Sequence, residues 1–105
     1  MIRIKLGNYG DYANAYSGPS WWVSINDIKL FYSYETIVAY RNNEEGLVVS
    51  ENVWSRTTGK HLNWIDPYKE HRVDADEFRR RLNNLLNRYE LKEKGLIERY
   101  NESIA

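Results

Sequence analysis

The sequence contains no cysteine, and this absence excludes disulfide frameworks, thiolate nucleophiles and cysteine-based zinc sites. No apolar run approaches the roughly 20 residues that a membrane-spanning helix requires. The N-terminus alternates apolar with basic residues, so it lacks the hydrophobic core of a signal peptide. We therefore expect a soluble, cytoplasmic protein that does not contact a membrane.

An excess of charge of either sign is also missing, because 15 basic residues balance 15 acidic ones. A general DNA coat needs a strong positive excess and an acidic mimic of DNA needs a negative one, so both classes are disfavoured. The 105 residues are expected to form a single domain, 1–105. Its core would bury roughly 60–70% of the surface that the unfolded chain exposes.

Aromatic residues, in contrast, are abundant, with four tryptophans and nine tyrosines. Tyr and Trp combine a large apolar body with a hydrogen-bonding tip, so they serve both as core residues and as interface anchors. A small core needs large side chains, which favours the first use. Thirteen such residues are too many for the core alone, and we expect several of them at a surface that meets a partner.

The first half of the chain has the patterns of an antiparallel meander of four or five strands. Asn26-Asp27 separates two β-prone runs and predicts a type I′ hairpin turn. A second hairpin is expected across the polar residues 41–46, with Tyr34-Glu35 as a connector before it. The predicted strands are Ile2–Leu6, Trp21–Ile25, Ile28–Tyr32, Thr36–Tyr40 and Leu47–Val49.

Residues Gly7–Pro19 are rich in Gly, Asn and Tyr and predict a long loop. A loop of this length in so small a domain is either functional or mobile. Its tyrosines at 9, 12 and 16 are also spaced to fit one face of a short helix.

The second half changes to a helical period. Leu62 and Ile65 lie three residues apart, and Asp66-Pro67 ends the pattern, which predicts a short helix over about 57–65. Its N-cap is Ser55, Thr57 or Thr58, and the sequence does not select between them. A longer amphipathic helix is expected near 75–93, so the predicted fold class is α+β.

The start of the longer helix carries the clearest local pattern. Asp74 as N-cap places Glu77 at the third helical position, as in a capping box, and Val73 then meets Phe78 as a hydrophobic staple. The apolar stripe continues through Leu82, Leu85, Leu86 and Tyr89. Gly95 indicates the C-terminal end, and the residues beyond it form a second short helix or an extension that docks on another chain.

The segment Trp54–Ile65 concentrates the groups that bind or orient ligands. A helix start offers unpaired N–H groups and partial positive charge, and Gly59 would let an anion approach the backbone. Around the helix, Lys60 points outward, His61 lies at the boundary and Thr58 faces inward with Leu62. The candidate partner- or anion-binding residues are Ser55, Arg56, Thr57, Lys60, His61 and Asn63.

Catalytic and metal sites are weakly indicated. A triad of Ser55, His61 and Asp66 can be written down, but nothing in the spacing requires it. His61 and His71 lack the spacing of a helical metal site, so we expect neither a metal nor a cofactor. Arg79–Arg81 with Arg88 fit a solvated helix face that is partnered by nearby carboxylates.

Two stretches resemble a family of small proteins encoded largely by phages, prophages and other mobile elements. These are Ser33-Tyr34-Glu35-Thr36-Ile37-Val38-Ala39 and Trp54-Ser55-Arg56-Thr57-Thr58-Gly59-Lys60-His61-Leu62-Asn63. The resemblance covers residues 31 to about 65, with a looser match at Val73–Phe78, and implies a mobile-element origin. It marks a polar set that the family shares, namely Ser55, Thr57, Thr58, Lys60, His61 and Asn63. It does not indicate which activity the protein has.

These observations favour a non-enzymatic accessory protein that acts by binding a partner in the host cytoplasm. The leading hypothesis is an inhibitor of a host defence system, similar to an anti-CRISPR, whose partner is a host protein or a protein–nucleic acid complex. The alternative is a nucleotide or nucleic-acid binder that uses the helix start at Thr57–Lys60. Homo-oligomer formation through the C-terminal tail is a further expectation.

Overall fold

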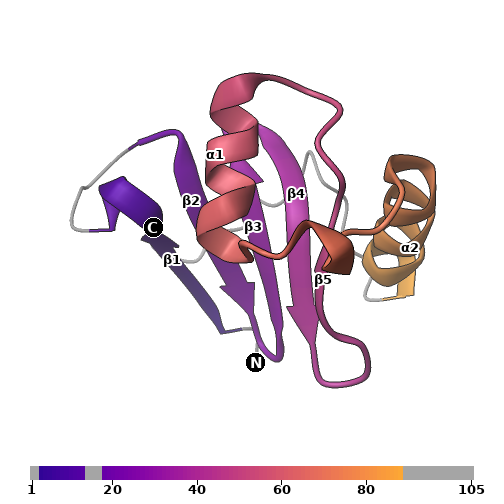
Figure 1. Cartoon of the computed structure of the whole chain (residues 1–105). Coiled ribbons are helices and arrows are strands. Elements are labelled where there is room, and N and C mark those ends of the chain that lie inside the picture. The colour runs from indigo at the N-terminus through magenta and orange to yellow at the C-terminus, as the bar shows by residue number, and fades with distance from the viewer. Residues whose placement is uncertain (1–2, 14–17, 89–105) are drawn as a thin grey trace.

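The protein is a five-stranded antiparallel sheet followed by two helices, the first of which lies across the front of the sheet in Figure 1. The computed structural model describes residues 3–13 and 18–88, without the side chain of Tyr12. The strands pair in chain order, which confirms the predicted α+β meander. They are β1 (Ile4–Asn8), β2 (Ser20–Ile25), β3 (Ile28–Ser33), β4 (Thr36–Asn42) and β5 (Gly46–Val49), followed by α1 (Arg56–Ile65) and α2 (Ala75–Arg88).

Two-residue turns join the three central strands. Asn26 follows β2 with a φ of 53°, whereas Asp27 has a negative φ. The predicted type I′ turn is therefore wrong, because that turn needs positive φ at both central residues. Tyr34 has a φ of 56°, so Tyr34-Glu35 is itself the turn of the β3–β4 hairpin and not only a connector.

β1 differs from the strand that the alternating pattern predicted, of which Ile2 lies outside the described residues. Ile4 packs against the core, but Leu6 is 44% exposed, because β1 is an edge strand. The strand also continues to Asn8, into the segment predicted as a loop. Within that segment, Gly10–Tyr12 forms a single 3₁₀ turn, and the Tyr9 hydroxyl donates to the Tyr32 carbonyl at 2.9 Å. The predicted tyrosine face cannot be traced further, since Tyr16 and the side chain of Tyr12 lie outside the described residues.

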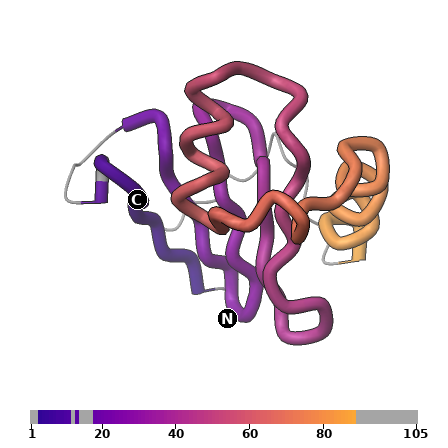
Figure 2. The backbone as a smooth tube through the Cα atoms, viewed as in Figure 1, coloured from indigo at the N-terminus to yellow at the C-terminus, as the bar shows by residue number. Residues whose placement is uncertain are grey.

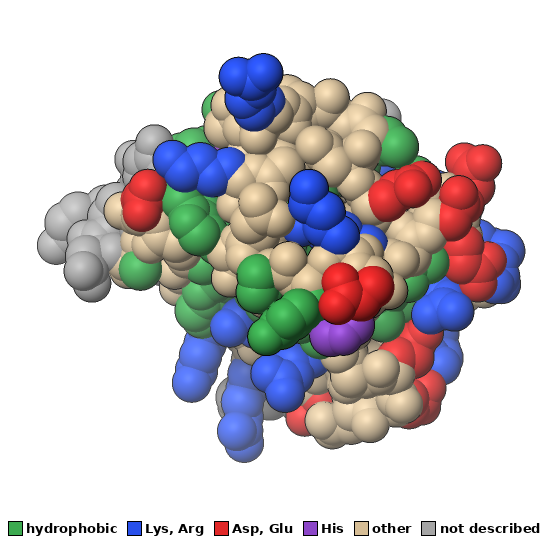
Figure 3. Space-filling model, in the orientation of Figure 1, with side chains coloured by type: hydrophobic (Ala, Val, Ile, Leu, Met, Phe, Trp, Pro, Cys, Tyr) green, Lys and Arg blue, Asp and Glu red, His purple; other side chains and the backbone are tan. Residues whose placement is uncertain are grey.

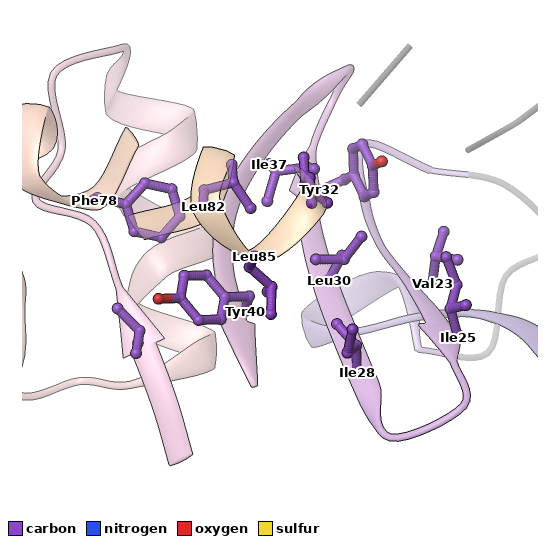
Figure 4. Close-up of a cluster of buried hydrophobic side chains, with 12 residues drawn as sticks. Val23, Ile25, Ile28, Leu30, Tyr32, Ile37, Tyr40, Phe78, Leu82 and Leu85 are labelled. Carbon is purple, nitrogen blue, oxygen red and sulfur yellow. The ribbon is translucent and has the colours of Figure 1, made fainter. Parts of the chain in front are cut away.

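The main core lies between the sheet and α2 (Figure 4). Side chains alternate along a strand, so Leu30 and Tyr32 share this face while Phe31 lies on the other. α2 contributes Phe78, Leu82, Leu85 and Leu86, as its predicted stripe requires. Tyr89 and the expected end of this helix near residue 93 lie outside the described residues, as does the tail.

The start of α2 is capped as predicted, with one difference. Asp74 Oδ2 accepts hydrogen bonds from the backbone N–H groups of Asp76 at 3.1 Å and of Glu77 at 3.3 Å. The Glu77 carboxylate is engaged by Arg80 and Arg81 and does not complete a capping box. A further backbone N–H at the start of α2, that of Ala75, donates instead to the Glu51 carboxylate at 3.0 Å.

A β-bulge shapes the face of the sheet that α1 covers. The β3–β4 register shifts at Phe31/Tyr32, which leaves Val38 as an extra residue in β4. Val38 and Ala39 therefore both turn toward α1, where they pack with Val49 and Leu62. Within residues 3–13 and 18–88, no helix is both long enough and apolar enough to cross a membrane.

Candidate functional site

α1 carries most of the residues that the sequence marked as a candidate site. The structure selects Ser55 as its N-cap, since the Ser55 Oγ accepts from the Thr58 N–H at 3.1 Å. The helix ends at Ile65 with Asp66 as its C-cap, where the following Pro67 cannot continue it. Figure 2 shows the helix running along the front of the sheet before the chain crosses to α2.

One stripe of α1 faces the sheet and consists of Thr58, His61, Leu62 and Ile65. These residues recur at the spacing i, i+3, i+4 and i+7, which places them on one side of a helix. Thr58, His61 and Leu62 are buried. Thr58 therefore lies inward as predicted. The predicted boundary position of His61 is wrong, because the side chain is only 1% exposed.

A buried polar network ties this stripe to the end of β3. The Ser33 hydroxyl lies 2.7 Å from Nδ1 of His61 and 3.0 Å from Oγ1 of Thr58. The Thr58 hydroxyl also accepts from the N-cap Ser55 at 3.3 Å. Each of these buried groups therefore has a partner, which offsets the cost of removing it from water.

Aromatic rings surround the His61 imidazole. Trp64 stacks on it with a centroid distance of 5.4 Å, Tyr34 lies at 5.9 Å, and Tyr9 meets it edge-on at 6.3 Å. Burial lowers the pKa of His61 below its usual value, and the adjacent Lys60 ammonium lowers it further. The imidazole is therefore neutral at pH 7, in an environment that suits a structural hydrogen bond.

The structure separates the members of the triad considered from the sequence. Ser55 caps α1, whereas His61 pairs with Ser33 and Asp66 pairs with His71 at 2.9 Å. The Tyr68 N–H and then the His71 side chain lower the pKa of Asp66. No group of three or more His, Asp or Glu side chains within residues 3–13 and 18–88 could hold a metal ion.

The opposite stripe of α1 lines a groove of about 600 Å³, which we call the α1 groove. Arg56, Gly59, Lys60 and Asn63 recur at the same helical spacing, rotated away from the sheet. The other wall comes from the segments that precede and follow the helix. The full lining is Glu51, Asn52, Arg56, Gly59, Lys60, Asn63, Lys69 and Arg72.

Gly59 has a packing role that the sequence did not indicate. A Cβ at this position would lie 2.8 Å from Nδ2 of Asn52. Asn52 fastens the turn before α1, because it donates to the Ser55 carbonyl at 2.9 Å and accepts from the Trp54 N–H at 3.0 Å. The expectation that Gly59 opens the backbone to a ligand is therefore wrong, since the Asn52 amide occupies that space.

Positive charge dominates the α1 groove. Four of its lining side chains are cationic, and Glu51 is the single carboxylate among them. Glu51 is already engaged by the Ala75 N–H. Among the four cations, Lys60 has a carboxylate partner within the described residues, Asp11 at 3.6 Å, and both of these side chains are more than 60% exposed. An exposed pair of this kind is weak and exchanges readily.

Arg72 is the most enclosed cation of the groove. Its Nη2 donates to Oδ1 of Asn63 at 2.7 Å. Its Nε is buried and has no acceptor within residues 3–13 and 18–88. A buried donor without a partner costs about 1–3 kcal/mol, while the same guanidinium holds its positive charge at the groove.

The structure thus distributes the six candidate residues over four places. Arg56, Lys60 and Asn63 line the α1 groove, and Ser55 caps the helix beside it. Thr57 is exposed outside the groove lining, and His61 lies beneath the helix.

Lys69 and Arg72 join the groove without a signal in the sequence. Val73 pairs with the end of β5 by a bond from its N–H to the Val49 carbonyl at 2.8 Å, and this contact carries the preceding residues back to α1. No local pattern predicts such a long-range bridge.

Comparison with known proteins identifies the family but no activity. Residues 4–80 match the model of a family of unknown function, DUF8033, and the chain belongs to that family. Neither the curated proteins nor the solved structures include a significant match to this chain. The function must therefore be argued from the site itself.

Proposed function

We propose that this member of the family is a binding protein that holds a phosphate-bearing ligand, a nucleotide or a nucleic-acid backbone, in the α1 groove. The observation that carries the proposal is the imbalance of charge in the groove, with four cations against one engaged carboxylate. A concave site lined by charge of one sign concentrates ions of the other sign. Phosphate groups are the commonest polyanionic ligands of clustered Lys and Arg.

The donors of the groove differ in how freely they move. Arg72 is held by its bond to Asn63 and presents a planar guanidinium in a fixed position. Arg56 and Lys60 stand on the exposed edge of α1 and can close over a ligand. A fixed donor with mobile cations around it suits a phosphate, whose oxygens accept several bonds at once.

Thr57 is the remaining candidate residue on this side of the protein. It is exposed in the first turn of α1, beside the groove residue Arg56. A ligand longer than one phosphate would extend along the helix toward this hydroxyl. We therefore place the helix start at the edge of the proposed site.

The test compares two double variants that remove equal charge. Arg56→Gln/Lys60→Gln changes the groove, and Arg80→Gln/Arg88→Gln changes α2, which covers the other face of the sheet. Binding of ATP and of inorganic tripolyphosphate would be measured by calorimetry at several salt concentrations. The groove variant should lose affinity and show a shallower salt dependence, while the α2 variant should match the wild type.

The proposal fails if the wild type binds no nucleotide, tripolyphosphate or oligonucleotide in a salt-dependent way. It also fails if the α2 variant loses as much affinity as the groove variant, because net charge alone would then explain binding. Melting temperatures of both variants should stay close to the wild type, since exposed charges contribute little to stability.

A second candidate function is supported by the apolar side chains near the groove. Val53 and Tyr68 are each 58% exposed, and Trp54 is 39% exposed. Val53 and Trp54 precede α1 and Tyr68 follows it, and exposed Trp and Tyr side chains are common anchors of protein-binding surfaces. We propose on this basis an accessory protein that occludes a host protein, such as a component of a defence system in the host cytoplasm.

This second candidate has its own test. Val53→Ser/Tyr68→Ser should abolish capture of a stoichiometric host protein and should leave tripolyphosphate binding unchanged. Capture that survives this change, or that recovers only nucleic acid, argues against the protein-binding candidate.

A further inference from the structure

A row of cations crosses the part of the sheet that α1 leaves open. The strand register places Lys5, Ser24, Lys29, Arg41 and Leu47 side by side on five successive strands. Each has neighbours in its strand that pack toward α2, so these five side chains point to the α1 face. We call Lys5, Lys29 and Arg41 the basic row.

The basic row has no neutralising carboxylate in the part of the chain that the structure describes. Within residues 3–13 and 18–88, none of its three cations has a carboxylate at salt-bridge distance. Lys29 stands opposite Arg41, and like charges in that arrangement destabilise a sheet. Burial lowers the pKa of Lys29, and the charge of Arg41 lowers it further. An anion bound here would offset the repulsion between Lys29 and Arg41 and would favour the charged form of Lys29.

Protection of the sheet edge does not explain this arrangement. Lysines on edge strands prevent unwanted strand pairing, and that role accounts for Lys5 on β1. Lys29 and Arg41 lie on β3 and β4, which are interior strands with partners on both sides. Their charge therefore requires a different reason.

The neighbouring row of the same face supplies aromatic rings. Gly7, Trp22 and Phe31 are aligned on β1, β2 and β3, two residues along from the basic row. The Trp22 ring lies against Gly7, where a Cβ would come within 2.3 Å of it. Lys29 Nζ lies 4.3 Å from the Trp22 ring centroid and 5.2 Å from that of Phe31. Figure 3 shows separate Lys and Arg side chains at the top, in the middle and at the lower edge of this face, while Asp and Glu lie mostly toward one side.

We infer that this open part of the sheet binds single-stranded nucleic acid, with the basic row on phosphates and Trp22 under a base. Half-buried aromatic rings beside cations on an open sheet face form a surface on which unpaired bases stack. A duplex keeps its bases stacked on each other and cannot offer them to Trp22. The inference goes beyond the proposed function, because none of these residues lines the α1 groove.

The probe is a fluorescein-labelled oligothymidine of about 15 nucleotides, within the length that a small domain occupies. Its anisotropy would be followed against protein concentration, with a duplex of equal length in parallel. Each phosphate contact on a single strand contributes about 0.7 to the slope of log K against log salt. Lys29→Gln/Arg41→Gln removes two contacts, so the slope should fall by about 1.4 and the affinity about 25-fold at about 0.1 M salt.

Trp22→Leu tests the stacking part of the inference. Loss of one stacked base should weaken oligothymidine binding about 5- to 150-fold with little change in the salt slope. Arg80→Gln/Arg88→Gln is the matched control for charge and should bind like the wild type. Melting temperatures show whether each variant is folded. If Trp22→Leu does not fold, Lys29→Gln/Arg41→Gln still tests the inference.

The outcomes separate this inference from the proposed function. Oligothymidine binding that is lost in the basic-row variant and kept in Arg56→Gln/Lys60→Gln supports the inference whatever the groove binds. Binding lost only in the groove variant overturns the inference and leaves the proposed function in place. Equal affinity for the duplex, absence of oligothymidine binding at low salt, or an unchanged affinity in both the basic-row variant and a folded Trp22→Leu also overturns it.

Discussion

The hydroxyl of Ser33 lies 2.7 Å from Nδ1 of His61, and this contact joins the last residue of β3 to the middle of α1. Both side chains are almost fully buried. The contact fixes how α1 is rotated over the sheet, because Thr58 bonds to the same hydroxyl one turn earlier. That rotation is what turns Arg56, Lys60 and Asn63 together toward the groove.

The buried imidazole makes folding stability depend on pH. The pKa of His61 is lowered in the folded protein by burial and by Lys60, whereas the unfolded chain has the ordinary value of about 6.5. The stability that neutral His61 contributes is therefore present above about pH 6.5 and is lost as the pH falls below it, where the unfolded chain binds the proton. The loss cannot exceed about 1.4 kcal/mol per pH unit.

Urea titrations between about pH 7.5 and about pH 5 measure this dependence. His61→Gln should be less stable at neutral pH and should show a shallower loss of stability on acidification. His71→Gln changes an exposed imidazole and serves as the control. If His61→Gln loses stability with acid as steeply as the wild type, the folded protein does not exclude the proton at this position.

Thr58 and Lys60 should separate stability from binding. Thr58→Ala leaves the buried Ser33 hydroxyl with one partner fewer and should cost about 1–3 kcal/mol in the free energy of unfolding. Lys60→Ala removes an exposed charge, so it should leave the unfolding midpoint nearly unchanged and weaken tripolyphosphate binding. Equal destabilisation by the two changes would contradict the assignment of Lys60 to a binding surface.

The N-cap of α2 can be tested by a conservative pair. Asp74→Ala removes the acceptor for the Asp76 and Glu77 N–H groups and should cost about 1 kcal/mol. Asp74→Asn keeps an equally good cap and should cost much less. Phe78→Ala empties part of the core and should cost about 3–5 kcal/mol. Similar small losses for Asp74→Ala and Phe78→Ala in urea titrations would mean that the helix start is not held as described.

Gly59 and Asn52 should show coupled effects. Alanine is about 1 kcal/mol better than glycine inside a helix, but a Cβ at position 59 would displace the Asn52 amide and the bonds that it makes. Gly59→Ala should therefore stabilise the Asn52→Ala background by about 1 kcal/mol and give little or no gain in the wild type. Additive effects in this double-mutant cycle would show that the two side chains do not compete for space.

The local patterns of the sequence were sufficient for much of the fold. Val73–Phe78 predicted the start of α2, because a cap and a staple are contacts between residues a few positions apart. Asn26-Asp27 predicted a hairpin, although not its turn type. The β3–β4 hairpin was harder to predict, since Tyr34 adopts a positive φ that is uncommon for a bulky residue.

The candidate site was also predictable only in part from local patterns. The sequence by itself determined that Lys60 points outward from a short helix, since that follows from the helical repeat, but it left Arg56 before a helix that in fact begins at this residue. Only the tertiary structure decided that His61 is buried, because its partner Ser33 is 28 residues away in the chain. The same holds for Lys69 and Arg72, which a bridge between Ser50 and Val73 carries to the groove. It holds too for the basic row, whose cations are neighbours only through the strand register. Periodicity in the sequence shows which residues of one helix or strand share a face. Contacts between helices and strands form only when the whole chain packs and buries its apolar surface.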